Sequence, residues 1–123
     1  MYEVNHIGVV VKNLDKSLDF YTQVLECTME DSFENDRGKF AFLQAGRQII
    51  ELIQYHGDSE PGRGAGHVDH IAFTVADIDA ETAKLRRKNV TLLFDEPRIT
   101  TSGKKILFFT GPDGERLEFV QKL

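Results

Sequence analysis

The chain contains very little cysteine: Cys27 is the only one among its 123 residues. No intrachain disulfide can form, which favours a reducing compartment, so we expect a cytoplasmic protein in which Cys27 is a packing residue. Long apolar runs are also missing, since none approaches the roughly 18 residues of a membrane span. The first residues, MYEVNHIGVVVKN, lack the basic-then-apolar order of a signal peptide. We therefore expect no membrane partner.

An excess of positive charge is absent as well. The formal net charge is −5 at pH 7, so no global attraction draws the chain to nucleic acid or to an anionic membrane. The hydrophobic fraction of 41% and the charged fraction of 28% are ordinary for a globular protein. We expect no nucleic-acid partner, and an anionic substrate would have to be held by locally placed Lys or Arg.

What the chain does contain is an internal repeat. HIGVVVKNLD, opened by His6, is answered by HIAFTVADID, opened by His70. IIELIQ, which holds Glu51, is answered by RLEFVQ, which holds Glu118, and GKFAFLQAG is answered by GKKILFFTG. A repeat of this length predicts that the fold is built from two similar units.

Each repeat predicts the element order β-α-β-β-β. The expected strands and helix of the first half are strand 4–12, a helix capped by Asn13 or Asp15, and strands 28–35, 39–44 and 48–54. Those of the second half are strand 68–75, a helix from Asp77 to about residue 88, and strands 92–98, 104–109 and 116–120. We predict an α+β fold of two βαβββ modules, residues 1–55 and 68–123, joined by a glycine-rich linker at 56–67.

Strand alternation places the repeated His and Glu side chains away from the wholly apolar strand faces, which should meet the helices. Two curved sheets that face each other would then bring two imidazoles and two carboxylates together. A single histidine at a strand start is usually an ordinary polar group. A carboxylate between apolar neighbours costs several kcal/mol unless it is paired, and here it occurs twice. We predict one divalent metal ion held by His6, Glu51, His70 and Glu118.

The segments HIGVVVKNLDKSLDFYTQVL, IIELIQ, HVDHIAFTVADI and GPDGERLEF resemble the vicinal oxygen chelate superfamily, and within it the small bacterial glyoxalase I (lactoylglutathione lyase) proteins. The resemblance implies the glyoxalase/bleomycin resistance/dioxygenase fold, in which paired βαβββ modules form a metal cup. Extradiol dioxygenases and fosfomycin-modifying enzymes use two His and one Glu, and methylmalonyl-CoA epimerases typically have Gln where Glu51 stands. The His-Glu-His-Glu set is similar to that of glyoxalase I.

The resemblance implies a reaction in which a hemithioacetal of a 2-oxoaldehyde becomes a 2-hydroxyacyl thioester. Glu118 or Glu51 would remove a proton from the substrate, and we favour Glu118. Ni or Co is the expected metal by resemblance, with Zn, Mn or Fe possible. The modules of small members often pair across a two-fold axis, so a homodimer is expected. A site closed within one chain remains the alternative.

Two positions depart from the bacterial glyoxalase I pattern: Val10 stands where the family typically has Arg, and Tyr55 where it tends to have Asn. Both changes remove polar groups that would hold glutathione, so another thiol, or a substrate without a thiol, stays open. The alternatives to a glyoxalase I are an epimerase, an Fe(II) dioxygenase, or a protein that sequesters an antibiotic or other small molecule.

Several further side chains are candidates for lining the cup. Arg98, Lys104 and Lys105 either hold a substrate carboxylate or phosphate at its mouth or are solvated charges. Arg116 shares a face with Glu118 and either pairs with a glutamate or anchors a substrate. Core packing or the pocket wall is the expected role of three phenylalanines, Phe40, Phe42 and Phe108.

Overall fold

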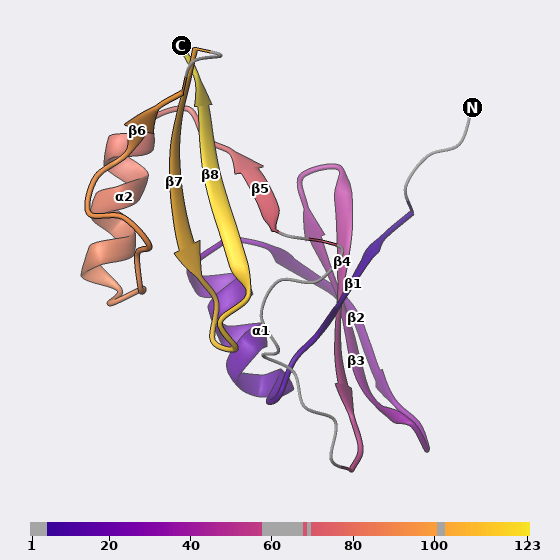
Figure 1. Ribbon diagram of the computed structural model, residues 1–123. Coiled ribbons are helices and arrows are strands. Elements are labelled where there is room, and N and C mark those ends of the chain that lie inside the picture. Colours follow the sequence, from indigo (N-terminus) through magenta and orange to yellow (C-terminus); the bar gives the residue numbers. More distant parts are fainter. Residues whose placement is uncertain (1–4, 58–67, 69, 101–102) are drawn as a thin grey trace. The chain divides into compact units, whose positions relative to one another are not determined.

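A computed structural model describes residues 5–57, 68, 70–100 and 103–123. The chain divides into two compact units, Met1–Gly62 and Arg63–Leu123, which we call the first and second modules. The first contains β1 (Ile7–Val10), α1 (Leu14–Gln23), β2 (Thr28–Glu34), β3 (Gly38–Ala45) and β4 (Gln48–Tyr55). The second contains β5 (Ile71–Thr74), α2 (Ile78–Arg87), β6 (Arg98–Ile99), β7 (Lys104–Thr110) and β8 (Arg116–Lys122) (Figure 1).

Both modules contain a mixed four-stranded sheet with the same topology. The strand order is β1-β4-β3-β2 in the first module and β5-β8-β7-β6 in the second. In each sheet the strand before the helix runs parallel to the last strand, and the other neighbours are antiparallel. A parallel pair needs a crossover connection, which here includes the helix. The predicted α+β fold of two βαβββ modules is confirmed.

One face of each sheet is buried with its helix. The helix α1 lies against β3 and β4, and α2 lies against β7 and β8. In β4, Ile50 is 1% and Leu52 is 0% exposed. Leu117 takes the equivalent position in β8 and is also 0% exposed. Because side chains alternate along a strand, burying these residues turns the glutamates between or beside them to the opposite face.

The helices begin at side-chain caps that are themselves repeated. The Oδ1 of Asn13 accepts a hydrogen bond from the Lys16 amide at 3.1 Å, so Asn13 rather than Asp15 is the cap of α1. The Oδ1 of Asp77 accepts from the Ala80 amide at 3.2 Å, which confirms the predicted start of α2. Each cap uses one of the amides that the first turn of a helix leaves without a backbone partner.

A second repeated bond ties each helix start to its sheet. The Oε1 of Gln54 in β4 accepts from the Leu14 amide at 2.7 Å. The Oε1 of Gln121 in β8 accepts from the Ile78 amide at 2.8 Å. Each glutamine comes three residues after the predicted metal-binding glutamate of its strand. The two glutamines therefore couple the orientation of each helix to the strand that carries the glutamate.

The predicted strand at 92–98 is wrong. The structure has only the short β6, and before it Leu92 makes an isolated bridge to Phe109. The Arg86 guanidinium donates to the backbone carbonyl of Asp95 and to the carboxylate of Glu96, the latter at 3.1 Å. Pro97 follows, and proline has no amide to give to a strand ladder. These local partners replace sheet pairing over most of the segment.

Neither helix suggests a membrane segment. Each spans 10 residues. Among the described residues there is no helix with the length and apolar character that a bilayer crossing requires.

Candidate metal centre

The first module brings one predicted pair together. His6 lies just before β1, and Gly8 of β1 is in register with Glu51 of the parallel strand β4. The Nε2 of His6 is 3.5 Å from the Oε1 of Glu51. The His6 side chain is 40% exposed and that of Glu51 is 15% exposed. The other ring nitrogen, Nδ1, lies 2.7 Å from the Oδ1 of Asn5. The pair therefore presents an imidazole nitrogen and a shielded carboxylate on one side of the sheet.

The second module builds the same pair from its own residues. His70 precedes β5, and Ala72 of β5 is in register with Glu118 of the parallel strand β8. The Nε2 of His70 is 3.1 Å from the Oε1 of Glu118, and the side chains are 33% and 11% exposed. The small residue beside each glutamate, Gly8 or Ala72, keeps the parallel strand from covering the carboxylate.

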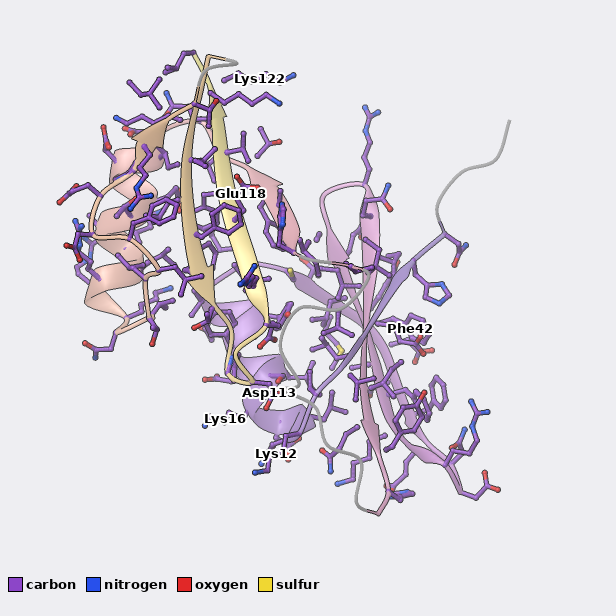
Figure 2. The ribbon with its side chains drawn as sticks, in the orientation of Figure 1. Lys12, Lys16, Phe42, Asp113, Glu118 and Lys122 are labelled. Carbon is purple, nitrogen blue, oxygen red and sulfur yellow. The ribbon has the colours of Figure 1, made fainter. Side chains whose placement is uncertain are left out.

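A phenylalanine completes each pair. Phe42 of β3 is opposite Glu51, and its ring meets the His6 ring edge to face, with centroids 5.8 Å apart. Phe108 of β7 is opposite Glu118, and its ring meets the His70 ring in the same way at 5.0 Å. Such contacts restrict the tilt of an imidazole. Figure 2 shows Phe42 and Glu118 on the sheets of their own modules.

The alignment of GKFAFLQAG with GKKILFFTG is off by one residue. Counted from the first glycine, Leu107 would match Phe42, whereas Phe108 takes that place in the sheet. The turn between β7 and β8 is longer than the one between β3 and β4, and it contains the PDG segment. Phe108 was expected in the core or the pocket wall, and counting backwards from Glu118 across this longer turn is the signal that could have placed it opposite the glutamate.

The other predicted cations separate onto two faces. Arg98 is the cross-strand partner of Ile106 in β7. Lys104 and Phe108 lie on the same side of β7 as Ile106, and this is the side that carries Glu118. Lys105 points to the other side, where its Nζ is 2.9 Å from the Oδ2 of Asp79 in α2. Of the two roles left open for Lys105, the structure argues against lining the mouth of the cup, because strand alternation directs its side chain to Asp79 on the helix side.

Each pair has the donor chemistry of half a metal site. A neutral imidazole nitrogen and a carboxylate oxygen are ligands for Zn, Ni, Co, Mn and Fe. Among the described residues no group of three or more His, Cys, Asp or Glu side chains forms a metal-binding cluster. Each module thus offers two donors, half of the predicted set of four.

A second His–Glu contact in the first module differs in kind. The Nε2 of His56 is 3.5 Å from the Oε2 of Glu34, but these side chains are 44% and 58% exposed. The same nitrogen lies 3.1 Å from the carbonyl oxygen of Asn35. Surface exposure and a backbone partner mark this as an ordinary surface contact, and no repeat copies it into the second module.

Comparisons with known proteins agree with this architecture. The chain matches the sequence model of the Glyoxalase/Bleomycin resistance protein/Dioxygenase superfamily over residues 3–119. It is 33% identical to the uncharacterized protein YwbC of Bacillus subtilis (strain 168) over 124 residues, which cover 97% of each chain. It is 32% identical to the lactoylglutathione lyase of Schizosaccharomyces pombe over 149 residues, which cover 98% of this chain and 48% of that enzyme. The chain spans about half the length of the yeast enzyme.

Solved structures also resemble the chain. The fosfomycin resistance protein FosX of Listeria monocytogenes superimposes with a TM-score of 0.80 and 21% identity, over 100% of this chain and 95% of that chain. Another crystal structure of FosX contains Mn(II) and a sulfate ion. At this level of identity the likeness shows the fold alone.

Proposed function

Because the chain belongs to the Glyoxalase/Bleomycin resistance protein/Dioxygenase superfamily, we propose that it is a metal-dependent lyase of the glyoxalase I type. Its substrate would be the hemithioacetal of a 2-oxoaldehyde and a thiol, and its product a 2-hydroxyacyl thioester. The observation that carries the proposal is the repeated pair in which a shielded glutamate lies beside an imidazole, at 3.5 Å in one module and 3.1 Å in the other.

Four residues would hold one divalent metal ion, namely His6, Glu51, His70 and Glu118. The ion would act as a Lewis acid that polarises substrate oxygens and lowers the energy of negative charge developing on them. Ni or Co is favoured, and Zn, Mn and Fe suit the same donors. With two acidic ligands in the set, the net charge of a divalent centre would be neutral before substrate binds.

A glutamate would perform the proton transfer. Its carboxylate takes the proton from the carbon that carries the hydroxyl and the sulfur, and an enediolate results. The proton then returns to the neighbouring carbon, which was the carbonyl carbon, and the thioester carbonyl forms on the first carbon. No oxidant or reductant is needed, because the step only moves hydrogen within the substrate.

We assign the base to Glu118. Its side chain is 11% exposed, and its Oε1 lies 3.1 Å from the Nε2 of His70. A carboxylate shielded from bulk water is better placed to return the same proton to the substrate before solvent exchanges it. Glu51 would serve as the second acidic ligand and could take the base role for substrate of the opposite configuration.

The thiol component need not be glutathione. On the Glu51 side of the first module, Tyr55 meets the Phe40 ring edge to face with centroids 6.4 Å apart, and Phe33 stacks on Phe40 at 4.9 Å. This aromatic surface and the apolar Val10 replace the polar groups expected for a glutathione tail. The proposal therefore covers thiols other than glutathione.

The first test is thioester formation from methylglyoxal and glutathione, by protein stripped of metal and reloaded with Ni(II). A rate that depends on the metal and exceeds the uncatalysed rate supports the proposal. If metal-loaded protein gives no thioester with glutathione, cysteine or coenzyme A, the lyase proposal fails. Deuterium exchange at the α-carbon of an acyl thioester would then point to an epimerase.

A mixing experiment tests whether the metal site is shared across a dimer or formed within one chain. In one variant both His6 and Glu51 are replaced by Ala, and in another both His70 and Glu118. If the site is shared across a two-fold dimer, mixing the two inactive variants restores about a quarter of wild-type activity, because half of the dimers are mixed and each has one intact site. If each site lies within one chain, mixing restores none. Light scattering of the same samples measures the oligomeric state.

A further inference from the structure

Positive charge gathers on one face of the second module although the chain as a whole is acidic. The formal net charge is −5. On the side of the sheet that carries Glu118, the register places four cations, from β6, β7 and β8: Arg98, Lys104, Arg116 and Lys122. The corresponding side of the first module, which carries Glu51, has mainly aromatic and aliphatic residues together with Asp31 and Gln44, and no Lys or Arg among its described strand positions.

Two of these cations oppose each other directly. Lys104 of β7 is the cross-strand partner of Lys122 of β8, and both are exposed. Neither ammonium group has an ion-pair partner among the residues that the structure describes. Like charges that face each other across a pair of strands destabilise the sheet. An anion bound between them would remove that repulsion.

A third cation is held in place by an aromatic ring. The guanidinium carbon of Arg98 lies 3.9 Å from the centroid of the Phe94 ring. Phe94 in turn meets Phe108, with centroids 5.9 Å apart, and Phe108 contacts His70. This row of rings connects the guanidinium to the predicted metal-binding pair. Stacking on an aromatic face leaves the edge of a guanidinium free to donate to an anion.

The neighbouring lysine shows that the arrangement is specific to one face. Lys105 follows Lys104 in β7 but points to the helix side, where Asp79 neutralises it at 2.9 Å. Removing either lysine changes the net charge by the same amount. The pair therefore offers a matched comparison between a cation on the Glu118 face and one off it.

We propose that Arg98, Lys104 and Lys122 form an anion-binding subsite on the sheet face that carries Glu118, towards the Lys122 end of β8. The subsite takes a carboxylate or a phosphate-type group. Figure 2 shows Glu118 part-way along β8 and Lys122 towards the end of that strand. Four residues of strand span about 13 Å. The anion therefore belongs to a part of the substrate remote from the reacting carbon, which is the thiol component, and this last assignment rests on the proposed function.

The first measurement is NMR titration of the full-length 15N-labelled protein with inorganic phosphate and, separately, with succinate. Perturbed amides are expected in β7 and β8 around Lys104 and Lys122. Lys104→Met and Lys122→Met should each weaken binding about tenfold, the loss expected for one charge-assisted hydrogen bond, and Lys105→Met should leave it within about twofold. Tighter binding of phosphate identifies a phosphate-type group, and tighter binding of succinate a carboxylate.

The subsite is overturned if neither anion binds in the millimolar range, or if Lys104→Met and Lys105→Met weaken binding equally. Perturbations confined to His70 and Glu118 also overturn it, because the anion would then occupy the metal-binding pair. A structural role is excluded by thermal unfolding, since Lys104→Met should keep or raise Tm by relieving repulsion. A lower Tm contradicts the proposal.

The titration needs no turnover, so its outcome is independent of the lyase test. Anion binding without thioester formation refutes the lyase and leaves the subsite. Thioester formation without anion binding refutes the subsite alone. Where both hold, Lys104→Met should raise KM for an anionic thiol and leave kcat within about twofold, because the lysine lies away from the reacting carbon.

Discussion

Replacing Glu118 by Gln is the substitution that most directly examines the proposed base. The amide has the shape of the carboxylate, and the side chain is only 11% exposed, so the packing around it should be preserved. We expect the free energy of unfolding to change by less than about 1 kcal/mol, since a buried charge is exchanged for a buried neutral polar group. The substitution therefore removes the base without removing the fold.

The effect of Glu118→Gln on the catalytic rate should be far larger than its effect on stability. A positioned general base contributes about 10²–10⁴-fold to a rate, and an amide cannot accept the proton. The amide oxygen can still approach a metal ion, so partial metal binding should persist. We expect kcat for thioester formation to fall by at least about 100-fold. The assay compares steady-state rates at equal metal content, which elemental analysis of each sample verifies.

Glu34→Gln is the matched control. Glu34 also lies 3.5 Å from a histidine, but its side chain is 58% exposed and belongs to no repeated pair. The Glu34→Gln variant should retain wild-type kcat and metal content. If Glu118→Gln keeps kcat within about tenfold of wild type at full metal content, the assignment of the base is refuted. If Glu51→Gln loses as much activity as Glu118→Gln, the two glutamates act together and the choice between them is wrong.

Four further predictions concern the rest of the structure. Burial raises the pKa of the Cys27 thiol to about 11, so at pH 8 about one thiol in a thousand is ionised. Alkylation by iodoacetamide should therefore be slow until the protein unfolds, and fast alkylation of folded protein contradicts this prediction. The buried hydroxyl of Ser17 has no hydrogen-bond partner within the described part of the chain, so Ser17→Ala should leave the stability to urea unchanged or raise it by about 1 kcal/mol. Gln121→Ala removes the acceptor of the Ile78 amide and should cost about 1–2 kcal/mol in urea unfolding; an unchanged midpoint would show that water replaces the bond. A Cβ on Gly38 would lie 2.4 Å from a carbonyl oxygen of β4, so Gly38→Ala should lower Tm by several degrees in calorimetry.

The two modules share a scaffold but differ on the face that carries the glutamate. In the first module the face that carries Glu51 has several aromatic rings, and in the second the face that carries Glu118 has Phe108 opposite the glutamate and cations further along the strands. The repeated features are the ones that position the pair: the small residue beside each glutamate, the edge-on phenylalanine and the glutamine that binds the helix. The unrepeated features lie further out, where different parts of a substrate would be held.

Much of this architecture could be predicted from local patterns in the sequence. Alternation along the strands placed His6 with Gly8 and separated Glu51 from its buried neighbours, because the side-chain period of a strand is a local property. The cap residue Asp77 was predictable for the same reason, since a cap depends on the amides of the next turn. The repeat then extended each inference from one half of the chain to the other.

Only the tertiary structure decided the features that depend on residues distant in sequence. The register of β7 with β8 puts Phe108 rather than Leu107 opposite Glu118, because the length of the connecting turn sets the register. Gln121 reaches an amide 43 residues away, and no local pattern marks a glutamine for that role. The strand predicted at 92–98 was lost to Pro97 and to contacts made by Arg86 from the helix. Periodicity along one segment is determined by the residues of that segment, whereas pairing between segments depends on partners that folding brings together.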